Sequence, residues 1–277
     1  MNVTTRQFEM LRDMIYEALG LSFDEGKLDF LEKRVEKRMG HLGVGTLDDY
    51  LFHLRFLDTR GAEMQALANL VTTNETYMFR EFEQLQGFAD HCLDEILAAK
   101  EKRGDKTLRI WSAGCSSGEE PYTLAIILRE VIHDIEDWDI QIVATDLDEV
   151  RLGMARAATY GPRSVRDVPE EYLSRHLRPL PNGEYEVRPE TKKLVEVRHL
   201  NLNDRSAMRS MRGFDFVFCR NVLIYFDDAS RKAVVDSFFH TLVKGGFLFL
   251  GHSESVGRIT SAFRLKRLGK HLVYCKE

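Results

Sequence analysis

The residues of this chain best placed for chemistry are a turn between two glycines, Gly114 and Gly118, and an acid that ends a later strand, Asp146. A short apolar strand ends at Gly114, the turn closes at Gly118, and a helix begins at about Glu119. A second apolar strand over 140–145 ends at Asp146, where an open α/β sheet places an acid to hydrogen-bond a ribose. The spacing predicts a site for an adenosine-containing cofactor.

The first turn of that helix indicates which cofactor. Glu119 and Glu120 would repel a pyrophosphate but suit hydroxyls and the ammonium group of S-adenosylmethionine, so the residues favour a sulfonium cofactor over NAD. We expect Glu120 to bind it and Glu119 only to complement the helix dipole. Asp146 could instead cap the helix that begins at Leu147, although its place after the strand favours the ribose.

The same turn also matches G-x-S-x-G, the nucleophile elbow of serine hydrolases, with Ser116 as nucleophile and His252 downstream. Two features weigh against a hydrolase. Several strands should precede such an elbow, whereas everything before Arg109 has helical spacing, and no oxyanion-loop sequence of the His-Gly-Gly-Gly kind is present.

Polar residues also follow a later buried strand over 214–219. Arg220, Asn221 and Tyr225 would stand at the carboxyl edge of the sheet, where open α/β folds bind ligands. Tyr225 could equally be a packed aromatic whose hydroxyl is satisfied elsewhere.

Composition restricts the remaining classes. The chain has 277 residues and a net charge of −5, which gives no general basic field for nucleic acid. Its four cysteines are far apart without a C-x-x-C pair, which argues against disulfides and structural zinc and fits a reducing cytoplasm. We expect no metal, and neither a signal sequence nor an apolar run of membrane-spanning length is visible.

Periodicity divides the chain into a helical domain over 1–75, a linker and connecting helix over 76–106, and an α/β domain over 107–277. In the helical domain, apolar residues at helical spacing stop at Gly20 and again at Gly40. Alternating runs over 185–188 and 193–197, with the turn residues 181–183, predict a small antiparallel β insertion at about 178–200.

Five motifs in this order and spacing resemble the chemotaxis receptor methyltransferases, the CheR family. They lie at 72–81, 111–121, 144–148, 218–227 and 251–254, and together they extend over nearly the whole chain. The resemblance implies an α/β fold: a small N-terminal helical bundle plus a Rossmann-like class I methyltransferase domain. It also implies a bacterial protein-glutamate O-methyltransferase that esterifies glutamates on chemoreceptor cytoplasmic helices, converting S-adenosylmethionine to S-adenosylhomocysteine.

Matching the family's motifs residue by residue assigns the site. The resemblance puts Asn201 and Leu202 beside the adenine, Arg220 and Asn221 near the reacting end, and Tyr225 close to the transferred methyl. We expect Arg80 to grip the methionyl carboxylate as a charge-assisted pair, so that Tyr225 and Arg80 carry the catalytic roles. The expected cofactor-binding residues are Asn74, Thr76, Arg80, Gly114, Glu120, Asp146, Asn201, Leu202, Arg220 and Asn221.

The receptor side rests on the second helix, which in the family faces the acidic methylation region. The positive residues there are Lys27, Lys33, Arg34, Lys37 and Arg38. A solvated ladder of i,i+4 charges is the competing interpretation, because acids interrupt the run. In some family members the β insertion docks a receptor C-terminal pentapeptide, and the short turn at 181–183 argues against this mode here.

We expect a cytoplasmic monomer that binds no nucleic acid and does not insert into a membrane. The alternatives are a methyltransferase acting on nucleic acid and a non-catalytic module that senses the cofactor.

Overall fold

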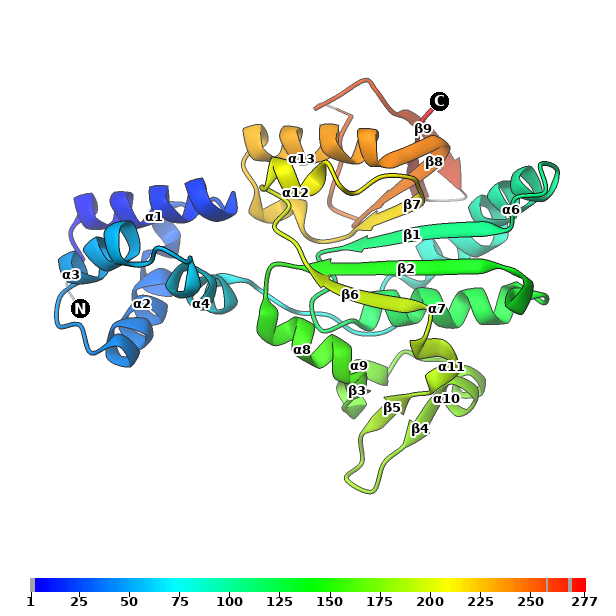
Figure 1. Ribbon diagram of the computed structural model, residues 1–277, viewed down its shortest axis with the longest axis horizontal. Coiled ribbons are helices and arrows are strands. Elements are labelled where there is room, and N and C mark those ends of the chain that lie inside the picture. Colours follow the sequence, from blue (N-terminus) through cyan, green and yellow to red (C-terminus); the bar gives the residue numbers. More distant parts are fainter. Residues whose placement is uncertain (1–2, 258, 269–270) are drawn as a thin grey trace.

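The N-terminal part of the chain is helical, as the spacing of its apolar residues predicts. The computed structural model describes residues 3–257, 259–268 and 271–277. The N-terminal elements are α1 (Thr5–Leu19), η1 (Glu25–Lys27), α2 (Leu28–Leu42), α3 (Leu47–Phe52), η2 (His53–Leu57) and α4 (Ala62–Val71). Their apolar faces meet in one core, and together they form the helical domain at one end of the molecule (Figure 1).

Local signals explain the ends of these helices. Thr4 and Gln7 form a reciprocal capping box at the start of α1, and Gly20 ends this helix in the left-handed conformation at φ 74°. The expectation that the second helix ends at Gly40 is wrong. It continues past this exposed glycine because its apolar face is still packed, and Gly43, with φ 71°, supplies the left-handed cap instead.

The expected connecting helix is one helical stretch with a π-helical middle. It consists of α5 (Phe82–Gly87), η3 (Phe88–Leu93) and α6 (Asp94–Glu101). The ring of Phe88 packs edge-on against three aromatic rings of the sheet, with centroids 5.0–5.7 Å apart: Phe216, Phe218 and Phe249. This stretch therefore belongs to the core of the α/β domain.

A mixed sheet forms the centre of the α/β domain. Within the described residues its order is β6 (Val195–His199), β2 (Asp139–Asp146), β1 (Thr107–Ala113), β7 (Phe214–Cys219), β8 (Leu242–Leu250), β10 (His271–Cys275) and β9 (Arg264–Leu268). The first five strands are parallel, while β10 runs antiparallel to both of its neighbours, β8 and β9. This confirms the predicted α/β class.

Helices cover both faces of this sheet (Figure 1). On one side lie α12 (Arg205–Met208) and α13 (Asp228–Thr241), and on the other lie α7 (Glu119–Val131) and α8 (Glu149–Ala157). Two short 3₁₀ turns complete the loops, η4 (Ile135–Asp137) and η5 (Leu223–Tyr225).

The small antiparallel insertion exists, but its strands differ from those expected. It contains β3 (Thr159–Tyr160), β4 (Leu177–Pro179) and β5 (Tyr185–Val187), with α9 (Pro162–Val165), α10 (Glu170–His176) and α11 (Pro189–Lys192). The prediction that 193–197 is an antiparallel partner in this insertion is wrong, because these residues enter β6 and pair in parallel with β2. The hairpin partner of β5 precedes the turn, so the small sheet spans 159–187 rather than 178–200.

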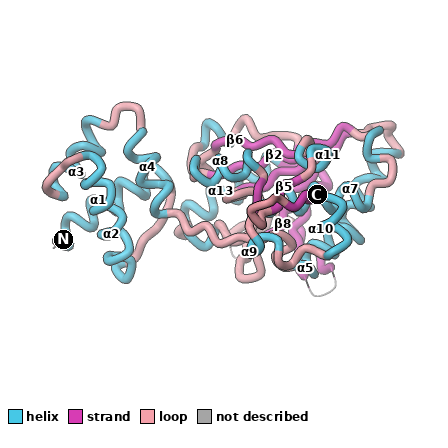
Figure 2. The backbone as a smooth tube through the Cα atoms, turned by 90° about the horizontal axis from the view of Figure 1, so that it is seen from below, coloured by secondary structure: helices cyan, strands magenta, loops and turns pink. Residues whose placement is uncertain are grey.

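The helical domain contacts the end of the α/β domain through several polar bonds. The Tyr16 hydroxyl donates to Asp227 at 3.0 Å, and the Asn201 side chain donates to the carbonyl of Ala18 at 2.8 Å. Figure 2 shows the two parts side by side. Residues that follow the parallel strands β1, β2 and β7 lie at the junction, together with residues that follow α1. Among the described residues, none of the helices combines the length and apolar character that crossing a membrane requires.

Candidate cofactor and acceptor site

A cavity of about 340 Å³ lies at the carboxyl edge of the sheet, next to the helical domain. Its walls are the loops after β1, β2, β6 and β7 together with the segment that joins α4 to α5. The predicted residues that line it are Asn74, Thr76, Arg80, Gly114, Glu120, Asp146, Asn201, Leu202, Arg220, Asn221 and Tyr225. The fold thus brings every residue predicted for cofactor binding or catalysis to one place.

The turn after β1 is shaped by its first glycine. Gly114 has φ 79°, and a Cβ added to it would lie 2.4 Å from a methyl carbon of Val222. The amides of Gly114 and Cys115 both donate to the carbonyl of Thr145, which ties the turn to the end of β2. Only glycine fits here, and the absent side chain leaves backbone exposed to the cavity.

The two glutamates that open α7 have different surroundings. Glu119 is 3% exposed, accepts hydrogen bonds from the hydroxyls of Ser117 and Ser164, and does not line the cavity. Glu120 does line the cavity and accepts a 2.7 Å hydrogen bond from the hydroxyl of Ser112. The expected distinction between a structural Glu119 and a cavity-lining Glu120 agrees with these positions.

Asp146 is 8% exposed at the end of β2. Its two oxygens accept hydrogen bonds from the amides of Ser116, at 2.7 Å, and Asp148, at 2.8 Å. Burial raises the pKa of Asp146, and these amides act in the opposite direction. The alternative role as a helix cap falls to Asp148, which accepts from the amides of Val150 and Arg151 at the start of α8. Asp146 keeps lone pairs that can accept further hydrogen bonds in the cavity.

The segment before α5 is fixed to both strand ends. The Asn74 side chain donates to Asp148, at 2.9 Å, and to the hydroxyl of Thr72. Its oxygen accepts from the hydroxyl of Ser116 at 3.3 Å. These bonds hold the backbone that presents Thr76 to the cavity.

Arg80 lies between two residues with an unusual backbone conformation. Its neighbours Phe79 and Glu81 both have positive φ, at 59° and 55°, which is strained for residues with a side chain. The guanidinium donates to the carbonyl of Glu75 at 2.9 Å and lies 5.8 Å from the ring centroid of Tyr77. Among the described residues no carboxylate pairs with it, so the group is free to bind an anion in the cavity.

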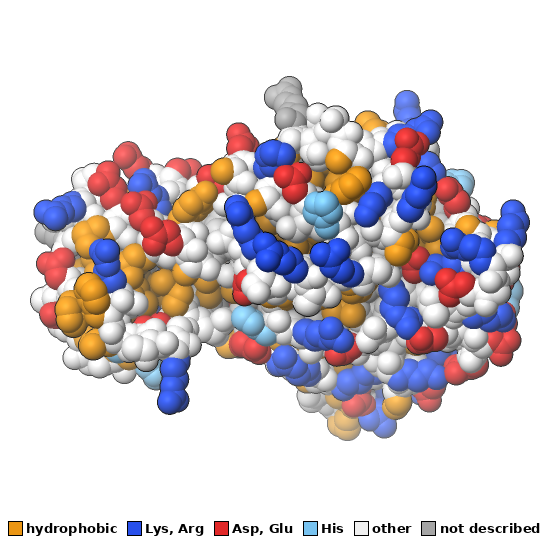
Figure 3. Space-filling view, turned by 45° about the horizontal axis from the view of Figure 1, so that its top comes forward, with side chains coloured by type: hydrophobic (Ala, Val, Ile, Leu, Met, Phe, Trp, Pro, Cys, Tyr) orange, Lys and Arg blue, Asp and Glu red, His pale blue; other side chains and the backbone are white. Residues whose placement is uncertain are grey.

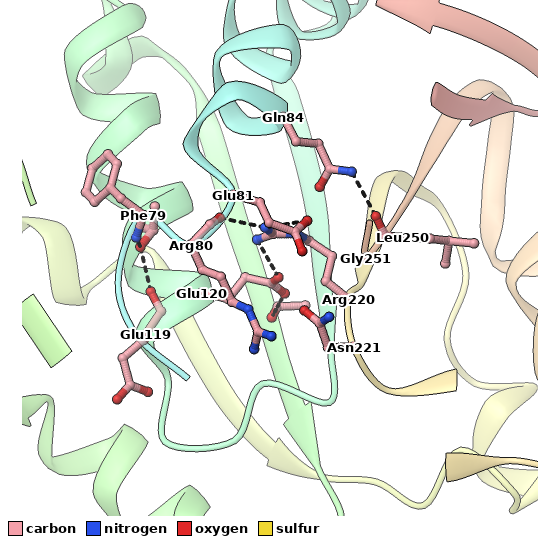
Figure 4. Close-up of polar contacts among 12 residues, drawn as sticks. Phe79, Arg80, Glu81, Gln84, Glu119, Glu120, Arg220, Asn221, Leu250 and Gly251 are labelled. Carbon is pink, nitrogen blue, oxygen red and sulfur yellow. Dashed lines mark hydrogen bonds and ion pairs between the residues drawn. The ribbon is translucent and has the colours of Figure 1, made fainter. Parts of the chain in front are cut away.

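A buried ion network explains how that conformation is kept. The side chain of Arg220 is 4% exposed and lies between Glu81 and Glu120, each 3.2 Å away (Figure 4). It also donates to the carbonyl of Arg80 at 2.6 Å. Removing a buried charge of this kind leaves its partners unpaired. Arg220 therefore fixes the Arg80 segment to the end of β7, whatever contact it makes with a cofactor.

The remaining predicted residues approach from β6 and β7. Asn201 donates to α1 and accepts from the amide of Asn203, and Leu202 is 9% exposed beside it. Asn221 has φ 61°, and its side-chain oxygen is buried with no partner among the described residues. Tyr225, on η5, is half-buried between the cavity and the core of the helical domain.

The serine hydrolase alternative is wrong. The hydroxyl of Ser116 is hydrogen-bonded to Asn74 and not to a histidine. His252 lies in the exposed loop after β8, where its backbone amide is 3.4 Å from a carboxylate oxygen of Glu81. The two residues do not form a nucleophile–base pair of the kind this chemistry needs.

The positive residues predicted on the second helix divide into two groups, and Lys27 among them lies in η1, just before α2. Arg38 donates two hydrogen bonds, at 2.9 and 2.6 Å, to the buried Glu63. Arg34 donates to the carbonyls of Leu70 and Phe30 and stacks on the Phe30 ring. The interpretation of these two arginines as part of a free positive strip is therefore corrected.

Lys27, Lys33 and Lys37 are exposed, and we call these three residues the lysine strip. Lys27 and Lys37 thus stay candidates for receptor contact, and Arg34 and Arg38 hold α2 to α4.

Three residues with clear roles at the site were not assigned from the sequence. Asp148 caps α8 and binds Asn74, Glu81 binds Arg220, and Glu254 accepts from the amide of Asn221. All three lie within the matched motifs. A signal existed for Asp148, since an acid two residues after a strand-end acid commonly caps the next helix.

The cavity fits S-adenosylmethionine. Gly114 lines the cavity with backbone alone, and Asp146 offers carboxylate lone pairs for hydroxyls. Arg80 offers a guanidinium without a carboxylate partner, and the buried oxygen of Asn221 offers an unpaired acceptor for an ammonium group. These groups correspond to the hydroxyl, carboxylate and ammonium parts of that molecule.

Comparisons with known proteins agree with this fit. Residues 74–271 match the family model of the CheR methyltransferase SAM-binding domain, and residues 6–72 match that of its all-alpha domain. The chain is 39% identical to chemotaxis protein methyltransferase 2 of Vibrio cholerae, covering 99% of this chain and 94% of that one. It is 32% identical to the chemotaxis protein methyltransferase of Borreliella burgdorferi, covering 92% and 90%. It is also 32% identical to chemotaxis protein methyltransferase 1 of Pseudomonas aeruginosa, covering 99% of both.

The two family models together extend over both domains described above, and the relatives match at almost full length. Both the resemblance inferred from the motifs and the choice of S-adenosylmethionine as cofactor are confirmed. The chain belongs to the CheR methyltransferase family, whose members are S-adenosylmethionine-dependent enzymes.

Proposed function

We propose that the protein transfers a methyl group from S-adenosylmethionine to glutamate side chains of chemoreceptor cytoplasmic domains, giving glutamate methyl esters. The relatives are named chemotaxis protein methyltransferases, which supports a role in sensory adaptation. We propose further that it acts in the cytoplasm and as a monomer.

The state of the acids around the cavity carries this proposal. Asp146 accepts two backbone amides, and Glu120 accepts from Ser112 and pairs with Arg220. Glu75, at the rim, pairs with Arg163. Because these acids are already hydrogen-bonded or ion-paired, they are suited to bind and orient a ligand and not to take a proton from it. They therefore suit an acceptor that needs no general base. A glutamate, with an ordinary pKa of about 4.3, is such an acceptor because it is already ionised at neutral pH.

The residues would divide the work as follows. When bound, S-adenosylmethionine supplies an electrophilic methyl group on a positively charged sulfur. Asp146 would hold ribose hydroxyls, Arg80 the methionyl carboxylate, and Asn221 the ammonium group, while Tyr225 would orient the acceptor carboxylate. Positioning of this kind is worth several kcal/mol, since effective molarities of about 10⁵ M are reached in good cases.

Charge at the surface supports an acidic partner. The lysine strip is exposed on the helical domain, and Lys and Arg side chains gather on the face of the α/β domain seen in Figure 3. Local positive charge on a protein of net charge −5 speeds encounter with acidic helices.

The deciding experiment incubates the protein with receptor-containing membranes and S-adenosylmethionine labelled in its methyl group. We expect label on the receptor band that alkali releases as methanol, as a carboxyl ester requires. Label that resists alkali, or membranes that stay unlabelled while the protein binds cofactor, would refute glutamate as the acceptor. Tyr225→Phe should lower turnover about tenfold or more while changing cofactor affinity little, because the hydroxyl is assigned to geometry at the reacting end.

A further inference from the structure

The loop after β8 contains a glutamate, Glu254, that contacts the Asn221 segment from outside the cavity wall. One carboxylate oxygen of Glu254 accepts two backbone amides, those of Asn221 and Gly251, each at 2.7 Å. Its other oxygen is shielded from solvent and has no partner among the described residues. A carboxylate in this position is committed to backbone and does not contact the cavity.

Two amides at the start of η5 also lie near this carboxylate, although only those of Asn221 and Gly251 are hydrogen-bonded to it. Burial raises the pKa of Glu254, and the backbone amides of Asn221, Gly251, Leu223 and Ile224 act to lower it. The first amides of a helical turn have no partner within the turn. Glu254 thus supplies, from a distant part of the chain, the acceptor that the segment leading to Tyr225 lacks.

Packing in this region leaves little room for adjustment. A Cβ at Gly251 would lie 2.8 Å from both the amide nitrogen of Asn221 and a carboxylate oxygen of Glu254. Asn221 has the left-handed conformation, at φ 61°, which must be held by its surroundings. The amide of Asn221 donates to Glu254, which makes this carboxylate one of the groups that surround the strained residue.

We propose that Glu254 is a positioning residue for methyl transfer: by accepting the backbone amide of Asn221, just before η5, it sets the orientation of Asn221 and, through the following segment, of Tyr225 at the reacting end. This inference rests on the proposed function for its kinetic part. It assigns a role to the 251–254 motif, which has no residue in the cavity wall.

The proposal predicts that turnover and cofactor affinity respond differently when Glu254 is lost. The groups expected to hold most of the cofactor, Asp146, Glu120 and Arg80, are fixed by contacts that do not involve Glu254. Loosening η5 should therefore lower kcat on receptor much more than it weakens cofactor binding.

The first test measures backbone hydrogen exchange in the absence of cofactor, by mass spectrometry on peptides covering 219–226. We expect Glu254→Ala to speed exchange there about tenfold or more, because the protecting acceptor is gone. Glu254→Gln keeps a carbonyl oxygen that can accept the same two amides, so it should restore most of the protection. Ser253→Ala, in the same exposed loop, is the matched control and should leave this exchange unchanged.

The second test measures receptor methylation and S-adenosylhomocysteine affinity for the same variants. We expect Glu254→Ala to lower kcat about tenfold or more while the dissociation constant changes less than about threefold, and Glu254→Gln to recover most of the turnover. Gly251→Ala, which crowds the same segment without removing a polar group, should reproduce the fall in kcat. Thermal melting identifies any variant that fails to fold.

Unchanged exchange over 219–226 in Glu254→Ala would overturn the proposal, and so would equal losses of kcat in the Ala and Gln variants. A fall in cofactor affinity as large as the fall in kcat would also overturn it, because Glu254 would then support the whole site. If wild-type protein methylates no receptor, the proposed function fails, and the exchange experiment still tests the role of Glu254.

Discussion

Replacing Asp146 by alanine is expected to weaken binding of S-adenosylhomocysteine without unfolding the protein. The carboxylate lies at the end of β2, is 8% exposed, and has two lone pairs left after accepting the amides of Ser116 and Asp148. These lone pairs are the ones available to ribose hydroxyls. The substitution removes them and leaves two amides beside a cavity that water can enter.

The size of the effect follows from the kind of hydrogen bond that is lost. A hydrogen bond to a charged group contributes about 1.5–3 kcal/mol, and we expect the substitution to cost the net worth of one such bond. A loss of about 1.5–3 kcal/mol corresponds to a dissociation constant about 10- to 150-fold higher. Asp146→Asn should fall between wild type and Asp146→Ala, because the amide oxygen still accepts one hydrogen bond.

Calorimetric titration of the purified variants with S-adenosylhomocysteine measures this directly. Asp139→Ala is the matched control, since Asp139 is the same residue type at the other end of the same strand, is 68% exposed and pairs with Arg109. We expect the control to bind like wild type. If Asp146→Ala also binds within about threefold of wild type and melts cooperatively, the ribose assignment is wrong.

Three further predictions concern the surface, the helical domain and pH. Changing all three residues of the lysine strip to glutamate should slow receptor methylation at low salt. The difference from wild type should shrink above about 0.1 M salt, where the Debye length is about 10 Å. Rate curves that coincide at every salt concentration would remove the strip from receptor binding. Arg38→Gln should destabilise the helical domain by about 3–5 kcal/mol in urea unfolding, because Glu63 is left buried without its cation. A double variant with Glu63→Leu should recover much of this loss. An unchanged unfolding midpoint in the single variant would contradict the argument. Hydrogen bonds from the hydroxyl and amide of Thr107 lower the pKa of Asp105 from 3.8 to about 2. The contribution of Asp105 to stability is therefore present above pH 4 and is lost as the pH falls toward 2. Asp105→Asn should flatten that part of the curve of stability against pH, and an equally steep curve would show that the carboxyl is not responsible.

The residues at the strand ends could be predicted from the sequence because their chemistry is local. A glycine that needs positive φ, an acid directly after an apolar run, and a helix starting with two glutamates are each readable within a few positions. Gly114, Glu120 and Asp146 line the cavity as this reasoning expects.

What could not be predicted depends on contacts between distant segments. Alternation over 193–197 indicates a strand but does not say which strand it pairs with, and β6 joins β2 in the main sheet rather than the nearby hairpin. Helical spacing places Arg38 on α2, but only the fold shows that Glu63, 25 positions later, occupies its guanidinium. Glu254 is a further case, because its partner Asn221 lies 33 positions earlier.

One small contact between the domains has a consequence for protein engineering. Leu21 and Phe226 form an antiparallel bridge, and the amide of Ser22 donates to the carbonyl of Tyr225 at 3.0 Å. The chain just after α1 is therefore hydrogen-bonded to the backbone of the tyrosine assigned to catalysis. A chimaera that exchanges the helical domain between relatives replaces part of the support of that tyrosine along with the lysine strip proposed for receptor contact. Transplanting receptor preference in this family thus requires residues 21 and 22 to be matched to the recipient's η5 segment.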